Sequence, residues 1–415
     1  MTSRTPSFLS DPLFQASGWL FVAFMVANLF SYGFQVAMGR LLLPQEYGFL
    51  NSLLGICVML SVPISTVLMA VSRGAAQCKA HEDFAGIRSL FEQAHWRILS
   101  TGFLGLLVFL LGARYLANYL HSASVIPLII FGLFAYASLA VPINTALLQG
   151  LQDYKWLGIA TALGGSFRFF FCIALVLAGF GVNGVLAGLV LTSAAAWLTA
   201  YVPIRKHLAR GRTCVGNAPP LALTQMWPVF LVSLGFTVMT QSDIILVTRY
   251  FPSQEAGMYA AAAILGRSVL YIPAAFVQAM FPMVSEHHAL NLDSRHLLTK
   301  SLAATLIFSG FGAVLFFLFP GLVISVFFSP RYLAAAPVLR CLGPAMLPMA
   351  LLMVLINYSI AKGERFFAYA LTAGAILEIV GISFWHGSLR QVVFVMMTFG
   401  TLQVAVGLLR RRWRA

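Results

Sequence analysis

Five ionisable side chains interrupt the long apolar segments of this 415-residue sequence: Arg168, Asp243, Arg267, Arg340 and Glu378. A charge in the hydrocarbon core of a membrane costs several kcal/mol, so each of these side chains should face protein or water rather than lipid. The arginines outnumber the acids, and arginine binds phosphate through paired hydrogen bonds. The set therefore favours a binding site for an anionic group such as phosphate.

Two interpretations of these residues remain open. Arg267 with Asp243, and Arg340 with Glu378, could form structural ion pairs that lock helices together. Alternatively, the three arginines could line a substrate cavity, with Asp243 and Glu378 as candidates for coupling to a proton or sodium ion. Arg168 is the best cavity candidate, since no acid in its half of the chain lies at its depth. Arg340 is the weakest, because it lies near a helix end and can extend to the interface.

Polar residues of the first apolar segment repeat with helical spacing. Asn28, Ser31, Tyr32 and Gln35 fall at i, i+3, i+4 and i+7, which is one face of a helix. The corresponding positions of a later segment include Gln241. We expect Asn28, Tyr32, Gln35 and Gln241 either to line a hydrophilic cavity or to form hydrogen bonds between helices.

No set of residues with catalytic spacing occurs in the sequence. His287, His288 and His296 form a histidine cluster with Glu286, but the spacing is not that of a HExxH zinc site. No phosphate-binding Gly-x-x-x-x-Gly-Lys-Ser/Thr sequence occurs either. We therefore predict a protein that is not an enzyme, with no catalytic residues, no metal site and no cofactor.

The composition requires a membrane. Hydrophobic residues make up 60% of the chain and charged residues only 9%, whereas a soluble domain carries about 25% charged residues. Apolar runs long enough to span a bilayer recur throughout, so the fold class is an all-α polytopic membrane protein of about twelve helices. The predicted spans are 17–39, 48–72, 98–120, 124–148, 156–178, 182–203, 225–248, 257–283, 301–319, 333–360, 366–385 and 390–409.

The basic residues indicate topology. Lys and Arg outside the spans gather in alternate connecting segments, on the same side as both termini. The positive-inside rule then predicts that both termini are cytoplasmic. The formal net charge of +14 is explained by this distribution, so nucleic acid is not an expected partner.

A short hydrophilic motif occurs twice, half a chain apart. "RLLLPQEYGFL" begins at Arg40 and "RYFPSQEAGMY" begins at Arg249, with Arg, Gln, Glu and Gly matched at the same spacing. Both copies lie between two spans, so they indicate two parallel six-helix repeats. The repeats predict an N-lobe at 1–203, a basic cytoplasmic linker at 204–224 and a C-lobe at 225–415.

These segments resemble a known family. "GRLLLPQEYGFLNSL", followed by a span ending in "AVSRGAAQ", is similar to the polysaccharide-biosynthesis (O-unit, or oligosaccharide) flippases of the multidrug/oligosaccharidyl-lipid/polysaccharide exporter (MOP) superfamily. "QSDIILVTRYFPSQEAGMYAAA" resembles the start of the second lobe in that family, with Asp243, Gly257, Tyr259 and Ala262 at the motif positions. Leu43 departs from the family, which often has Gly before the proline. The chain has twelve predicted spans, whereas some lipid-II-type members of the superfamily have fourteen. This difference disfavours a lipid-II flippase.

The resemblance implies two six-helix lobes around a central cavity, working by alternating access. It further implies a flippase that moves an undecaprenyl-pyrophosphate-linked oligosaccharide to the outer leaflet of the bacterial cytoplasmic (inner) membrane. The glycan would serve a surface polysaccharide such as O-antigen lipopolysaccharide or exopolysaccharide. Membrane lipids and other polysaccharide assembly proteins are the further partners to consider. Arg168, Arg267 and Arg340 would neutralise the pyrophosphate.

Two alternatives keep other function classes open. A multidrug or cation antiporter would share the fold, although a positive buried zone disfavours a cationic substrate. A membrane-embedded glycan polymerase or transferase would need positioned acid and base residues, usually on a sizeable outer loop, whereas the predicted outer loops are short.

Overall fold

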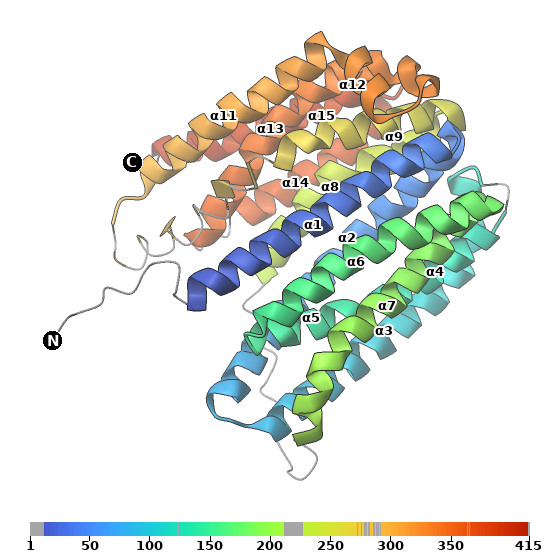
Figure 1. The fold of residues 1–415 in the computed structure, drawn as a ribbon. Coiled ribbons are helices and arrows are strands. Elements are labelled where there is room, and N and C mark those ends of the chain that lie inside the picture. Colours follow the sequence, from blue (N-terminus) through green and yellow to red (C-terminus); the bar gives the residue numbers. More distant parts are fainter. Residues whose placement is uncertain are drawn as a thin grey trace. The chain divides into compact units, whose positions relative to one another are not determined.

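A computed structural model shows the chain as a set of long helices (Figure 1). It describes residues 12–210 and 227–413, except Ala123, several positions between 272 and 291, Gly363 and Arg365. Within these residues, ten helical stretches are long and apolar enough to cross a membrane. One of them, 56 residues long, contains two helices joined by a short turn, so the number agrees with about twelve spans. The predicted fold class is confirmed.

Contacts between residues divide the chain into two compact units. Unit 1 contains Met1–Leu41 and Ile64–Leu223, and unit 2 contains Leu42–Pro63 and Thr224–Ala415. The boundary inside the first half falls directly after Pro63, within one continuous helix. Because Pro63 has no N–H, the helix lacks one backbone hydrogen bond at this boundary. Residues 211–226 lie outside the described residues, so most of the predicted linker 204–224 does too, and 204–210 continue the preceding helix.

Unit 1 consists of helices from the first half of the chain. They are α1 (Pro12–Leu41), the later part of α2 (Pro44–Ala80), α3 (Phe84–Tyr119), α4 (Ile126–Ser138), α5 (Ala140–Gly150), α6 (Tyr154–Leu175), η2 (Val176–Phe180) and α7 (Gly181–Arg210). In Figure 1 α1 and α6 run side by side, and they share one of the most extensive contacts of the unit. The predicted span 124–148 is divided into α4 and α5 shortly before Pro142, whose missing N–H weakens the helix there.

Local turns set the ends of the unit 1 helices. Asp83 caps α3 by accepting a hydrogen bond from the Gly86 N–H, at 2.7 Å. Asp153 caps α6 in the same way through Trp156, at 3.2 Å. A side-chain oxygen at this position satisfies an amide that the helix itself cannot. Within η2, Gly179 has a φ of 90°, a left-handed conformation that glycine adopts without strain.

Unit 2 contains the first part of α2 and the helices of the second half. They are α8 (Trp227–Tyr250), α9 (Ser253–Arg267), η5 (Ser268–Leu270), α11 (Arg295–Leu318), α12 (Pro320–Phe327), η6 (Pro330–Ala335), α13 (Ala336–Ala361), α14 (Phe366–Phe384) and α15 (Leu389–Trp413). The predicted span 257–283 begins with α9 and continues through η5 into a stretch that is described only in part.

The two copies of the repeated motif contact each other inside unit 2. A Cβ added to Gly48 would lie 2.8 Å from the Gly257 backbone nitrogen. A Cβ added to Gly257 would collide with the Pro44 carbonyl oxygen. One turn further along α2, the hydroxyls of Ser52 and Thr248 are 2.6 Å apart. The helices α2 and α9 therefore cross at their first turns with backbone against backbone, which only glycine permits.

This crossing generates a stability prediction. Gly257→Ala forces the backbones of α2 and α9 apart, so we expect a loss of roughly 1–3 kcal/mol or more, as for other overpacked sites. The measurement is the melting temperature of the purified protein in detergent. Gly310→Ala is the matched control, because a Cβ at Gly310 in α11 meets no atom within 4 Å. An unchanged melting temperature for Gly257→Ala would contradict the close approach.

Candidate functional site

A buried polar network in unit 2 is centred on Asp243 of α8, which is completely buried. Arg267, the last residue of α9, donates a hydrogen bond from Nη2 to Asp243 Oδ1, and the two form an ion pair. Tyr259, two turns earlier in α9, donates its hydroxyl to Asp243 Oδ2 at 2.9 Å. Arg267 also donates from Nη1 to Gln241 Oε1 at 3.1 Å. Both carboxylate oxygens of Asp243 are thus satisfied.

A second acid, Glu378 of α14, lies in the same region of unit 2. Its side chain is completely buried, and neither carboxylate oxygen has a hydrogen-bond partner among the described residues. Asp243 is near enough to interact with it electrostatically. Tyr259 also approaches the Met396 sulfur of α15 at 3.3 Å. Helices α8, α9 and α14 therefore supply a compact cluster of two acids, one arginine and one tyrosine, and Met396 of α15 packs against it.

The pairing of Arg340 with Glu378, considered above as one interpretation, is not present in the described structure. Arg340 of α13 is exposed and makes no ion pair within the described part of the chain, whereas Glu378 is buried in the cluster. The pairing of Arg267 with Asp243, considered in the same interpretation, is present. Arg340 belongs to another surface of unit 2, and Arg267 has a structural partner.

Arg168 lies in unit 1, on α6 and against α1. Its guanidinium carbon is 4.2 Å from the centre of the Phe34 ring, a cation–π contact, and the side chain is half-buried. The neighbouring Phe169 and Phe170 both contact Phe30 of α1. This aromatic packing holds the arginine on the α1 side of α6.

The polar stripe predicted on the first span lies on α1. Tyr32 and Gln35 are half-buried, and Asn28 is exposed. Gln241, predicted as their counterpart, accepts the hydrogen bond from Arg267 in unit 2. The predicted site residues thus form two groups, one with Arg168 in unit 1 and one with Asp243 in unit 2, apart from Arg340.

Tyr259 is the functional candidate that sequence reasoning did not identify as a partner of Asp243. Its position after Gly257 and its spacing of eight residues from Arg267 place both side chains on related faces of α9. That spacing is the signal in the sequence that Tyr259 and Arg267 could reach a common partner. The contact itself depends on how α8 and α9 pack, and no spacing within one helix predicts it.

The family model described as "Polysaccharide biosynthesis protein" matches residues 37–337. The chain belongs to this polysaccharide biosynthesis family. The matched range contains the cluster residues Asp243, Tyr259 and Arg267 as well as Arg168, and it ends before Arg340 and Glu378. No curated protein matches the sequence.

Solved structures share the fold. A multidrug resistance MATE family transporter of the MOP superfamily, in an inward-facing conformation, is 13% identical, with a TM-score of 0.77 over 95% of this chain and 98% of that one. The lipid II flippase MurJ, in an inward closed conformation, is 13% identical, with a TM-score of 0.69 over 95% of this chain and 87% of that one. A MOP superfamily transporter from Pyrococcus furiosus is 13% identical, with a TM-score of 0.63 over 96% of this chain and 94% of that one. The chain is therefore a multi-pass membrane protein with a fold found in transporters and a flippase.

The buried ion pair generates a second prediction. Asp243→Asn leaves the Arg267 charge uncompensated, and removing one partner of a buried pair costs about 3–5 kcal/mol. We expect a large fall in thermal stability of the purified protein, and partial recovery when Arg267→Met is added. Arg88→Gln is the control, because the Arg88–Glu92 pair is exposed and such pairs contribute about 0–1 kcal/mol. Simple additivity of the two buried substitutions would argue against a coupled pair.

Proposed function

We propose that this protein is a flippase that translocates an undecaprenyl-pyrophosphate-linked oligosaccharide from the cytoplasmic to the outer leaflet by alternating access. The observation that carries the proposal is the membership of residues 37–337 in the polysaccharide biosynthesis family, in a chain with a fold shared by a lipid flippase. The membrane is the bacterial cytoplasmic (inner) membrane, with both termini in the cytoplasm. The protein carries out no covalent chemistry in this proposal, so it acts as a transporter and not as an enzyme.

Arg168 has the role of binding the pyrophosphate. A guanidinium group offers several N–H donors in one plane, which match two phosphate oxygens. Its guanidinium group is held against the Phe34 ring, so less side-chain freedom is lost when phosphate binds. Asn28, Tyr32 and Gln35 on the adjoining α1 supply hydrogen bonds to the sugar hydroxyls.

The Asp243 cluster has the role of coupling transport to an ion. An unpartnered Glu378 carboxylate would be costly as an anion in a buried position, so the cluster gains stability by taking up a proton or a sodium ion. Neutralising Asp243 would weaken its hold on Arg267 and leave that guanidinium free to contact the substrate. Ion binding and substrate binding would then be linked through one arginine.

A multidrug or cation antiporter is the second candidate. The MATE family transporter shares the fold with a TM-score of 0.77, and buried acids such as Asp243 and Glu378 are suited to a cationic substrate. Drug efflux from cells expressing this protein, with surface polysaccharide unaffected by its deletion, would favour this candidate over the flippase.

The flippase proposal predicts the effect of replacing Arg168. Deletion of the gene should trap the lipid-linked oligosaccharide on the inner leaflet, where added periplasmic probes do not reach it. Restoring the gene as Arg168→Gln should give transport roughly 10- to 100-fold lower, because a hydrogen bond to a charged group contributes about 1.5–3 kcal/mol. Arg114→Gln, which changes an exposed arginine of α3, should transport normally. Normal transport by the membrane-inserted Arg168→Gln protein would contradict the assigned role.

Coupling through Glu378 gives a separate prediction. Glu378→Gln keeps the shape of the side chain and removes its capacity to exchange a proton or bind a cation. In proteoliposomes we expect the variant to lose the acceleration that a proton or sodium gradient gives to the wild-type protein. Thr372→Val, six residues before Glu378 in α14, is the control for packing in this helix. A variant that still responds fully to the gradient would exclude Glu378 as the coupling residue.

A further inference from the structure

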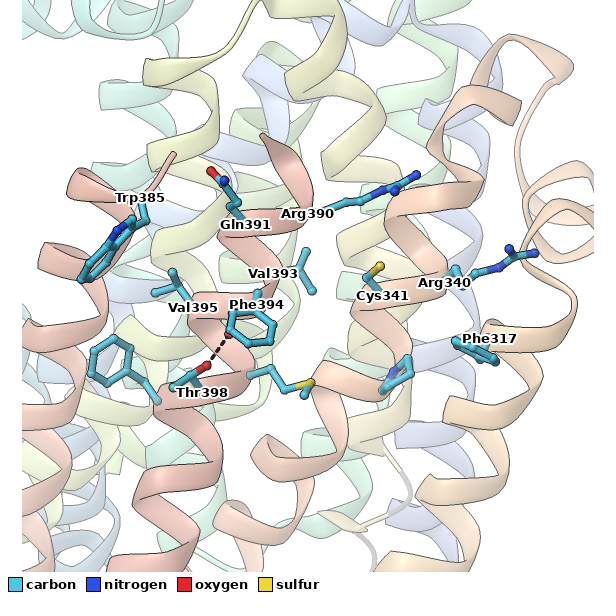
Figure 2. Close-up of a pocket in the computed structure, with 13 residues that line it drawn as sticks. Phe317, Arg340, Cys341, Trp385, Arg390, Gln391, Val393, Phe394, Val395 and Thr398 are labelled. Carbon is cyan, nitrogen blue, oxygen red and sulfur yellow. Dashed lines mark hydrogen bonds between the residues drawn. The ribbon is translucent and has the colours of Figure 1, made fainter. Parts of the chain in front are cut away.

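A groove lies on unit 2 between α11, α13 and α15, apart from the Asp243 cluster. Its volume is about 800 Å³, which is within the range of about 300–1,000 Å³ that is usual for small-molecule sites. Its floor is formed by apolar side chains, namely Phe317, Pro344, Phe394, Met397 and Phe399. Figure 2 shows Phe394 of α15 in the middle of the lining and Phe317 of α11 beyond Cys341 of α13.

Two arginines stand at one end of this groove. Arg340 is in the second turn of α13 and Arg390 is the second residue of α15, so both lie near the start of their helices. In Figure 2 both side chains extend from the upper end of the groove toward the same side. Both are exposed, neither makes an ion pair in the described part of the chain, and no acidic residue lines the groove. The end of the groove therefore has an uncompensated positive charge.

Aromatic side chains mark the same level of the bundle. Trp385, directly after α14, lines the groove and is largely exposed. Tryptophan concentrates where a membrane meets water, at the level of the lipid headgroups. Phe394, one turn deeper in α15, is 66% exposed, which is suited to hydrocarbon and not to water. The groove thus changes from cationic and aromatic to apolar over about one helical turn.

We propose that this groove binds one phospholipid with an anionic headgroup. Arg340 and Arg390 bind the headgroup phosphate, and an acyl chain lies on the apolar floor. The order of the lining, charge at the end and hydrocarbon below, is the order of groups in a phospholipid. A soluble phosphate would gain nothing from the apolar floor, and the lack of an acid in the lining disfavours the ammonium group of a zwitterionic lipid. The bound lipid would hold α13 and α15 together at that end of unit 2.

This assignment separates Arg340 from the substrate arginines. It does not depend on the transported molecule, so it remains testable if the flippase proposal fails. The matched arginine for comparison is Arg331 in η6, which is also exposed in unit 2 but does not line the groove.

The experiment measures lipid binding to the full-length protein, purified in detergent and freed of lipid. Phosphatidylglycerol, phosphatidylcholine with the same acyl chains, and inorganic phosphate are titrated separately. Bound lipid is counted by native mass spectrometry, and melting temperature is followed in parallel. We expect one saturable phosphatidylglycerol site that raises the melting temperature, weaker binding of phosphatidylcholine, and no stabilisation by phosphate alone.

Variants then locate the site. Arg340→Gln with Arg390→Gln should weaken phosphatidylglycerol binding at least about tenfold, because each arginine contributes to the attraction of an anionic lipid. Arg340→Lys with Arg390→Lys should retain the preference for phosphatidylglycerol, and Arg331→Gln should bind as the wild type does. Thr398→Trp, which fills the groove without changing charge, should also weaken binding. The proposal is overturned by equal affinity for the two lipids, by unchanged binding in the glutamine double variant, or by phosphate alone reproducing the stabilisation.

Discussion

Hydrocarbon surroundings offer no hydrogen bonds to a backbone amide and no solvation to a charge, and the structure depends on this constraint. Helices satisfy their own amides, which is why the described chain is built from long helices. The same constraint acts on buried side chains. Asp243 is tolerated in the core of unit 2 because Arg267 and Tyr259 satisfy both of its carboxylate oxygens. Glu378 is the exception, and an unsatisfied group in such a place is a reason to expect ion binding.

Close helix approach is the second requirement, and it connects the repeated motif to the polar cluster. Gly48 and Gly257 bring the first turns of α2 and α9 into backbone contact. The following turns of α9 are alanine-rich and buried, so this helix packs closely against its neighbours. Tyr259 and Arg267 extend from that helix to Asp243. A motif that binds no substrate can thus still determine the geometry of the proposed coupling site.

The three buried or membrane-level arginines have different environments, and their roles follow from these. Arg267 is held by an acid, so its availability depends on the charge of Asp243. Arg168 rests on an aromatic ring in unit 1 and is proposed to meet the pyrophosphate. Arg340 is exposed at the end of an apolar groove and is proposed to hold a lipid headgroup. Residue type and depth made them look equivalent, and their neighbours distinguish them.

The sequence by itself determined the fold class, because hydropathy and the length of apolar runs are local properties that a bilayer selects directly. It also identified the two motif copies and the family. It offered the ion pair of Arg267 with Asp243 as one of two interpretations. Only the tertiary structure decided that Gly48 meets Gly257, that Arg340 does not pair with Glu378, and that Tyr259 completes the Asp243 network. These contacts join residues of different helices. Helical periodicity tells which side chains share a face, but it does not tell which helix that face meets.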